Sequence, residues 1–278
     1  MTRALLPILL SILRKAKRSK VIEEIKMKLK VMTFNLRYRT ENDGVNFFDN
    51  RAPRVIETIK KEAPDLIGFQ EATDFQRDFL RRELSDSYIV LGCGRGSNYR
   101  GEAPCLAYRR DMFELVKYDT FWLSDTPHIA GSRYESLDQS GCPRYTAYAV
   151  LSPDGYEGSI AFFNTHLDHK GEQARIAGMK QTAEAIKALG GKFVLTGDMN
   201  DFPDSKCIAV AKEIEGAVDA AESVTHTFHN FGKIKDNYKI DYIFTNAQVL
   251  GAYAVEDIPT DGVYISDHYP VCAYIDLI

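Results

Sequence analysis

The sequence predicts an α/β protein in which two mixed β-sheets pack face to face and helices cover their outer faces. Many short segments rich in Val, Ile, Phe and Tyr predict strands, whereas only about four segments show the periodicity of an amphipathic helix. Part of the chain alternates strand and helix, which is typical of parallel sheets, and part runs from strand to strand, which is typical of antiparallel ones. A two-sheet sandwich with outer helices accommodates both patterns.

The predicted strands are runs of β-branched and aromatic residues, several of them apolar throughout, which indicates that both faces are buried. In chain order they cover residues 29–36, 65–70, 88–93, 104–109, 113–123, 145–151, 159–167, 192–197, 239–245, 249–256 and 269–277. No internal repeat, low-complexity tract or long linker interrupts this series. We therefore expect residues 29–278 to form a single domain.

The predicted helices lie between some of these strands. They cover residues 51–62, 74–84, 171–189 and 204–214. The first places Val55 and Ile59 on one face, as an amphipathic helix requires. The third runs into Gly190, which is a natural stop, and Asp204 or Ser205 can cap the start of the fourth.

The bulk composition restricts the class of substrate. The chain has 278 residues, a net charge of -4 and a sequence pI of about 5.9. Proteins that bind long nucleic acids without sequence preference usually carry an excess of basic residues. A small or short substrate is therefore favoured over a long duplex.

The first residues carry a short apolar run at 4–13, interrupted by Pro7 and followed by a basic cluster at 14–18. The run is too short to span a bilayer, and its charge lies on the wrong side for a secretion signal. A peripheral amphipathic anchor, a poor secretion signal and an extension upstream of the true start all remain open. We favour a dispensable extension over 1–28, and we expect membrane contact only through it.

The cysteines are five in number, form no CxxC pair and match no zinc spacing. The sequence therefore predicts reduced, mostly buried thiols and a cytoplasmic location. No obligate protein partner is evident.

Polar residues occupy the ends of the apolar strands. They are Asn35, Glu71, His166, Asp198 with Asn200, Asp241, and the pair Asp267 and His268. Several strands that end in such residues can gather them at one edge of the sheets. Crowded carboxylates repel one another unless a hard cation lies among them, and Mg²⁺ needs only one or two protein carboxylates. The pattern therefore predicts a magnesium-dependent hydrolase, with Mn²⁺ as the alternative metal.

Acid–base chemistry is expected from His268, because a neutral imidazole can take a proton from water near pH 7. Its neighbour Asp267 should point to the opposite side of an extended chain. Asp241 is the better partner, since it interrupts an apolar run in which an unpaired charge would be costly. Asp198 and Asn200 lie two residues apart and can steady a water and a phosphate together.

Other catalytic classes lack their signatures. His166 and His169 are spaced like zinc ligands, but neither an HExxH motif nor a cysteine cluster accompanies them. The chain has no GxSxG elbow for a serine hydrolase and no GxxxxGK[ST] loop for nucleotide binding. We interpret His166 and His169 as phosphate or transition-state contacts.

Taken in order, these segments resemble the endonuclease/exonuclease/phosphatase superfamily, which includes deoxyribonuclease I, inositol polyphosphate 5-phosphatases, neutral sphingomyelinases, nocturnin and related deadenylases. The Gly-Asp-x-Asn segment at 197–200 and the Ser-Asp-His segment at 266–268 are specific in combination. The resemblance covers residue 29 to the end and implies a four-layer α/β sandwich. It also implies these roles: Glu71, Asn35 and Asp267 at the metal; Asp198, Asn200 and His166 on water and phosphate; Asp241 and His268 as catalytic dyad.

The resemblance implies in-line attack of water on phosphorus without a covalent intermediate. Segments around 101–110, 121–127 and 144–147 are similar to a bacterial branch near nocturnin and the deadenylases, and Glu102, Arg144 and His169 could contact substrate there. The leading hypothesis is a phosphodiesterase acting on a nucleotide or short nucleic acid. A phosphomonoesterase of a small metabolite or sugar phosphate, a lipid phosphodiesterase and a catalytically inactive binding protein are the alternatives.

Overall fold

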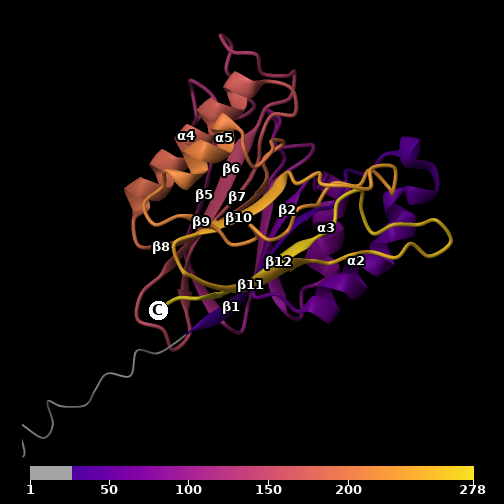
Figure 1. The fold of residues 1–278 in the computed structure, drawn as a ribbon, viewed down its shortest axis with the longest axis horizontal. Coiled ribbons are helices and arrows are strands. Elements are labelled where there is room, and N and C mark those ends of the chain that lie inside the picture. Colours follow the sequence, from indigo (N-terminus) through magenta and orange to yellow (C-terminus); the bar gives the residue numbers. More distant parts are fainter. Residues whose placement is uncertain (1–26) are drawn as a thin grey trace, which may run out of the picture.

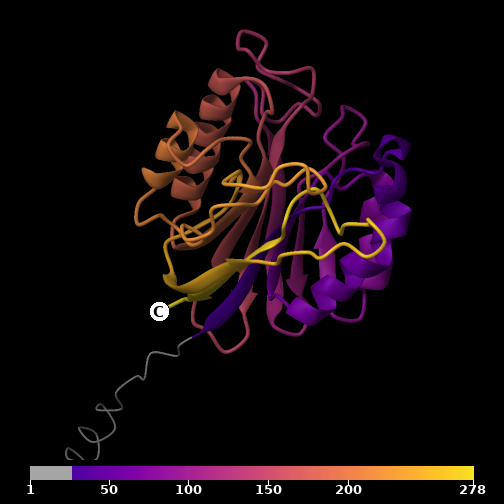
Figure 2. The same ribbon diagram turned by 45° about the vertical axis from the view of Figure 1, so that its right-hand side comes forward.

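The computed structural model describes residues 27–278, which form two six-stranded sheets packed face to face with helices outside them (Figures 1 and 2). The predicted four-layer α/β sandwich is confirmed. The extension predicted for 1–28 lies almost entirely outside the described residues.

The first sheet has the strand order β11-β12-β1-β2-β4-β3. Its strands are β1 (Lys28–Asn35), β2 (Leu66–Gln70), β3 (Tyr88–Leu91), β4 (Cys105–Arg109), β11 (Gln248–Ala254) and β12 (Val271–Asp276). Only β1 and β2 are parallel to each other, and the remaining neighbours are antiparallel.

The second sheet has the order β5-β6-β7-β8-β10-β9. Its strands are β5 (Phe113–Trp122), β6 (Tyr145–Pro153), β7 (Ile160–His166), β8 (Lys192–Asp198), β9 (Val218–Asp219) and β10 (Asp241–Thr245). Here β7 and β8 form the parallel pair, and the other pairs are antiparallel. Each sheet thus contains one parallel pair, and the helix that connects its two strands packs outside.

The helices are α2 (Phe48–Glu62), α3 (Asp74–Glu83), α4 (Glu172–Leu189), α5 (Lys206–Lys212) and the short 3₁₀ helix η1 (Glu41–Asn46). Figure 1 shows α2 and α3 on the side of the first sheet and α4 and α5 on the side of the second. As predicted, α4 ends at Gly190, and Ser205 caps α5 by accepting a hydrogen bond from the Ile208 backbone N–H. Within the described part of the chain, no helix is long and apolar enough to cross a bilayer.

Two hydrophobic clusters hold the layers together. The larger one fills the space between the sheets and reaches α2, with Phe34, Phe69 and Phe162 among its fully buried members. The smaller one lies between the second sheet and α4 and α5, with Phe163 and Tyr242 in it. All five cysteines are free thiols, which confirms the prediction.

Asn164 joins the two sheets at their closest approach. Its Nδ2 donates to the backbone oxygens of Phe69 and Cys105, each at 2.8 Å, and its Oδ1 accepts from Gln70 Nε2 at 2.7 Å. A Cβ atom at Gly68 would lie 2.6 Å from that Oδ1, so this position requires glycine. These bonds fix the register of one sheet on the other beneath the cleft described below.

Every predicted strand and helix has a counterpart, with ends displaced by a few residues. The sequence analysis missed β9 and η1. Both are too short to show a hydrophobic period, and β9 is a two-residue edge strand that exists only because β10 lies beside it.

Candidate active site

The polar strand ends meet at one edge of the sandwich. Register explains this: Asp198 pairs with His166 across the parallel strands and with Asp241 across the antiparallel ones. On the first sheet, Asn35 pairs with Gln70, so that Glu71 emerges next to it. The carboxyl ends of both parallel pairs therefore open into the same space.

A cleft of about 770 Å³ occupies this edge. Of the predicted site residues, those that line it are Glu71, Glu102, Arg144, His166, His169, Asp198, Asn200, Asp267 and His268. Asn35 and Asp241 lie directly behind the lining, bonded to Asp198 and His268 respectively. The structure thus gathers the whole predicted set around one cleft.

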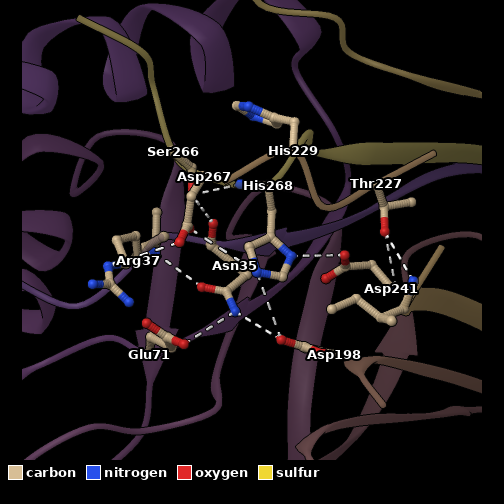
Figure 3. Close-up of polar contacts among 12 residues, drawn as sticks. Asn35, Arg37, Glu71, Asp198, Thr227, His229, Asp241, Ser266, Asp267 and His268 are labelled. Carbon is tan, nitrogen blue, oxygen red and sulfur yellow. Dashed lines mark hydrogen bonds and ion pairs between the residues drawn. The ribbon is translucent and has the colours of Figure 1, made fainter. Parts of the chain in front are cut away.

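His268 is held from behind by Asp241, whose Oδ2 lies 2.8 Å from His268 Nδ1 (Figure 3). The Asp241 side chain is buried, and Thr227 Oγ1 accepts a hydrogen bond from its backbone N–H. The nearest Asp267 oxygen is 4.0 Å from His268 Nε2, so the prediction that Asp241 pairs with this histidine is confirmed. With Nδ1 bonded to the carboxylate, Nε2 is left to face Asp198 at 3.9 Å.

Burial and the charges around the dyad shift the pKa values of both His268 and Asp198. Burial would lower the pKa of His268, but the charge and hydrogen bond of Asp241 outweigh it and raise the pKa to about 10. Burial, and then the charge of Asp241, raise the pKa of Asp198 to about 7. Asp198 and His268 therefore hold at least one proton between them at neutral pH in the metal-free protein.

Asp198 is fixed on both oxygens. Its Oδ2 accepts from Asn35 Nδ2 at 2.9 Å, and its Oδ1 accepts from the Asn200 backbone N–H at 2.9 Å. Asn200 has a φ of 50°, in the left-handed region that Asn tolerates, and its Nδ2 donates to the Leu167 carbonyl. This turn directs Asp198 and Asn200 toward the same part of the cleft, with His166 Nε2 3.5 Å from Asp198 Oδ2.

The other side of the cleft collects oxygen atoms suited to a hard cation. Glu71 has a φ of 61°, and its Oε2 accepts from the Tyr38 backbone N–H at 2.9 Å. Asp267 is buried nearby; burial and the charge of Glu71 raise its pKa, while His268 and Arg37 act in the opposite direction. A divalent cation would relieve this repulsion, and carboxylate and amide oxygens are what Mg²⁺ prefers.

Two groups of possible ligands have donor atoms within 4.8 Å of one another in the described residues. One is Asp198, Asp241 and His268, and the other is Glu71, Glu102 and His166. In the first group, the histidine Nδ1 is already bonded to Asp241. In the second, Glu102 is paired with Arg95 at 2.7 Å, and this cation opposes a metal at that end.

Arg51 is a buried residue that sequence reasoning missed. Its guanidinium donates from Nη1 to the carbonyls of Leu36 and Ile265, both at 2.8 Å, and from Nη2 to the carbonyl of Arg37 at 3.1 Å. These carbonyls adjoin Asn35 and the segment that leads to Asp267, so Arg51 ties together two segments far apart in the chain, one of them 214 residues from Arg51 itself. An arginine on the apolar face of a predicted helix was the available signal.

One wall of the cleft is cationic. Arg144 Nη2 lies 3.1 Å from His169 Nδ1, and its Nε lies 3.9 Å from Asp168 Oδ2. Arg95 and Glu102 form the adjacent ion pair. Sequence reasoning singled out Arg144, His169 and Glu102 but not Arg95, because nothing in its local sequence distinguishes it from a surface arginine.

Another part of the cleft lining is aromatic, and the sequence analysis gave these residues no role in the site. It is formed by the loop at 226–240, with Phe228, Phe231 and Tyr238, and by Tyr264 from the loop before β12. Phe231 has a φ of 54°, which is strained for an aromatic residue, and its ring centre lies 6.3 Å from that of Tyr264. A loop aromatic carries no periodic signal that would reveal such a surface.

A comparison with protein-family models finds the endonuclease/exonuclease/phosphatase family over residues 32–268. The chain belongs to this family. Its members are phosphoester hydrolases that generally depend on a divalent metal, so the chain is a phosphoric ester hydrolase. The resemblance inferred from the strand-end motifs is thereby confirmed.

Solved structures of the endonuclease/exonuclease/phosphatase family share this architecture. A family member from Bacteroides vulgatus has a TM-score of 0.84 and 31% identity, covering 91% of this chain and 100% of its own. A mannosyl-6-phosphatase from Bacteroides thetaiotaomicron has a TM-score of 0.80 and 25% identity, covering 89% and 99%. TDP2 from D. rerio, complexed with a single-strand DNA product, has a TM-score of 0.68, covers 89% and 98%, and at 15% identity shows the fold alone.

Proposed function

We propose that this protein is a Mg²⁺-dependent hydrolase of a small phosphorylated molecule, which directs water in line onto phosphorus. The observation that carries the proposal is the arrangement of His268. Its Nδ1 is held by Asp241, and its Nε2 faces Asp198 within the cleft. This is the geometry of an oriented imidazole beside a fixed carboxylate, with room for a reacting group in front of both.

Glu71, Asp267 and Asn35 would hold the metal. The crowding of Glu71 and Asp267, which raises the pKa of Asp267, is the observation that fits a divalent cation here. When bound, Mg²⁺ or Mn²⁺ would supply positive charge for the phosphoryl oxygens.

The chain's own residues divide the remaining work. Asp198, held by Asn35 and Asn200, orients the water and accepts its proton. As the water oxygen bonds to phosphorus, the bond from phosphorus to the leaving oxygen breaks on the opposite side, and the leaving oxygen takes a proton from solvent. His268, which Asp241 keeps protonated, donates from Nε2 to a phosphoryl oxygen. His166 and the Asn200 side chain contact the phosphate from the side of the second sheet. The sequence alone placed proton acceptance on His268, and the surrounding carboxylates favour Asp198 instead.

Two substrate classes remain candidates. A phosphomonoester of a small metabolite or sugar fits the cationic wall of Arg144 and Arg95, and one structural relative is a mannosyl-6-phosphatase. A nucleotide phosphodiester, which sequence reasoning placed first, is favoured by Phe231 and Tyr264, because an aromatic wall can stack a base. The lipid alternative depended on 1–28, nearly all of it outside the described residues.

A chromogenic panel tests the proposal. We expect the full chain to release nitrophenol from p-nitrophenyl phosphate or bis(p-nitrophenyl) phosphate with Mg²⁺, to stop on addition of EDTA and to recover with excess Mg²⁺. The His268→Ala variant is the inactive control. Activity that persists in EDTA, or no hydrolysis of a broad set of monoesters and diesters, would overturn the proposal.

A further inference from the structure

Arg144 stands just before β6 and is buried, with 4% of its surface exposed. Its Nη2 has a partner in His169, but among the described residues neither Nε nor Nη1 has a hydrogen-bond acceptor. A buried donor without an acceptor is destabilising, because it has lost its hydrogen bond to water and gained none in the protein. Two such donors on one guanidinium, in a side chain that lines the cleft, indicate a group that arrives from outside the chain.

A small niche opens from the cleft beside this guanidinium. Glu71, Arg95, Glu102, Arg144 and His166 line both the cleft and the niche. Buried residues close the niche behind; they are Ala103, Pro104 and Tyr145. Its volume is about 10 Å³, which is enough for a single oxygen atom and too little for a carbon substituent on that oxygen.

The charges of the niche suit an anionic oxygen. Burial, and then the charge of Arg95, lower the pKa of the Arg144 guanidinium, and an anion beside it would oppose both effects. Of the two carboxylates present, Glu102 is already paired with Arg95, and Glu71 belongs to the proposed metal set. Burial and the nearby arginines also keep His166 neutral.

The niche lies where one oxygen of a reacting phosphate would be expected. In-line attack leaves three phosphoryl oxygens in the plane between the attacking and leaving groups. One would face Glu71 and Asp267, and another Asn200 and His166. The third would lie toward Arg144. A phosphomonoester has three terminal oxygens to offer, whereas a diester carries a substituent on one of them.

We propose that this niche binds the third terminal oxygen of a phosphomonoester and thereby makes the enzyme discriminate against phosphodiesters. The inference rests on the proposed hydrolase function and narrows its substrate class to compounds with an unsubstituted terminal phosphate. Arg144 acts as a binding residue through its unpartnered Nη1 group, and the closed back of the niche excludes an esterified oxygen.

The test uses two substrates with one leaving group, p-nitrophenyl phosphate and methyl p-nitrophenyl phosphate, which differ by one methyl on a terminal oxygen. We expect wild type to favour the monoester by about 100-fold or more in kcat/KM. Arg144→Gln should lower kcat/KM for the monoester about 10- to 100-fold, the value of a hydrogen bond to a charged group, and for the methyl ester much less. Arg144→Lys should restore only part of the monoester kcat/KM, because it keeps the charge but not the planar guanidinium that reaches the niche. Arg100→Gln is the matched control, since Arg100 is 73% exposed.

Binding of inorganic phosphate, measured by calorimetry with Mg²⁺ present, separates failure of this inference from failure of the function. Weaker phosphate binding by Arg144→Gln supports the niche even if neither ester is hydrolysed, in which case the proposed function falls. Equal loss on both esters, a wild-type preference for the methyl ester, or unchanged phosphate binding overturns the niche and leaves the hydrolase assignment standing.

Discussion

Both sheets place side chains in the cleft at the ends of a parallel pair of strands, but they contribute different kinds of side chain. In each, a parallel pair of strands ends at the cleft, β1 and β2 on one side and β7 and β8 on the other. The first sheet brings Glu71 and Asn35, next to the buried Arg51 and the half-buried Arg37. The second brings Asp198 and its register neighbours. In the proposed mechanism the first group holds the metal and the second positions the water and accepts its proton, so equivalent strand ends support different steps.

The dyad crosses between the halves. His268 belongs to the loop before β12 of the first sheet, whereas Asp241 begins β10 of the second. The proton-handling group therefore depends on the sheets keeping their relative position, which Asn164 secures beneath it. This difference between the two halves, and the joint between them, can be tested separately.

The largest effect is expected at the dyad of His268 and Asp241. His268→Ala should lower kcat at least about 10³-fold, because it removes both a charged donor and the partner of a buried carboxylate. The measurement is steady-state hydrolysis of p-nitrophenyl phosphate, with folding checked by circular dichroism. The exposed His128→Ala is the control. A loss below 10-fold would remove His268 from the mechanism.

In the first half, substitution of a proposed metal ligand should change how activity depends on Mg²⁺. Glu71→Gln should lower activity about 10²-fold at fixed Mg²⁺ and raise the Mg²⁺ concentration for half-maximal rate, since one anionic ligand is lost. A Mg²⁺ titration of activity, with thermal shift as a second readout, measures this. The control is Glu57→Gln, on the exposed face of α2. An unchanged Mg²⁺ dependence would contradict the division between the halves.

Asn164, which joins the two sheets, should affect the stability of the fold. Asn164→Ala leaves the carbonyls of Phe69 and Cys105 without their donor and should lower the free energy of unfolding by about 2–4 kcal/mol. Urea denaturation measures it, and the same samples report kcat. If stability falls while the ratio of monoester to diester hydrolysis stays constant, Asn164 holds the sheets together without shaping the substrate site. A change below 0.5 kcal/mol would show that the apolar core alone fixes the sheets.

The smallest effect concerns a histidine without a carboxylate partner. Burial, and then the neighbouring His268 and His226, lower the pKa of His229 to about 4. A lowered pKa means that stability is full above about pH 6.5 and is lost as pH falls toward 4, by about 1–2 kcal/mol at pH 5. The pH dependence expected from His268 has the opposite sign: its contribution to the free energy of unfolding is full below about pH 6.5 and is lost as pH rises through about 10.

NMR titration of the metal-free protein distinguishes these two histidines. His229 should titrate near pH 4 and His268 near pH 10, and Asp241→Asn should lower the pKa of His268 far more than that of His229. The free energy of unfolding should be lower at pH 5 than at pH 7, and His229→Gln should abolish the part of this difference that His229 causes. Equal pKa values for the two rings would mean that Asp241 does not set the difference.

The strand-end residues were readable from the sequence because each follows a continuous apolar run. Asp241 interrupts the apolar run Ile-Asp-Tyr-Ile-Phe, which indicates a buried charge that needs a partner. The sequence alone therefore predicted its pairing with His268. Arg95, Arg51 and the aromatic loop were not readable in this way. Their importance comes from contacts with residues distant in sequence, such as Ile265 for Arg51.

Hydrophobic period and strand-end chemistry are local properties of the chain, so the family, the layered α/β fold and the residues that meet at the cleft could be predicted before the fold was known. The positions of the cationic and aromatic parts of the cleft, and the small niche beside Arg144, emerge only in the folded protein. The size of a cavity and the satisfaction of a buried donor depend on atoms brought together by packing, and no single segment of the chain encodes them.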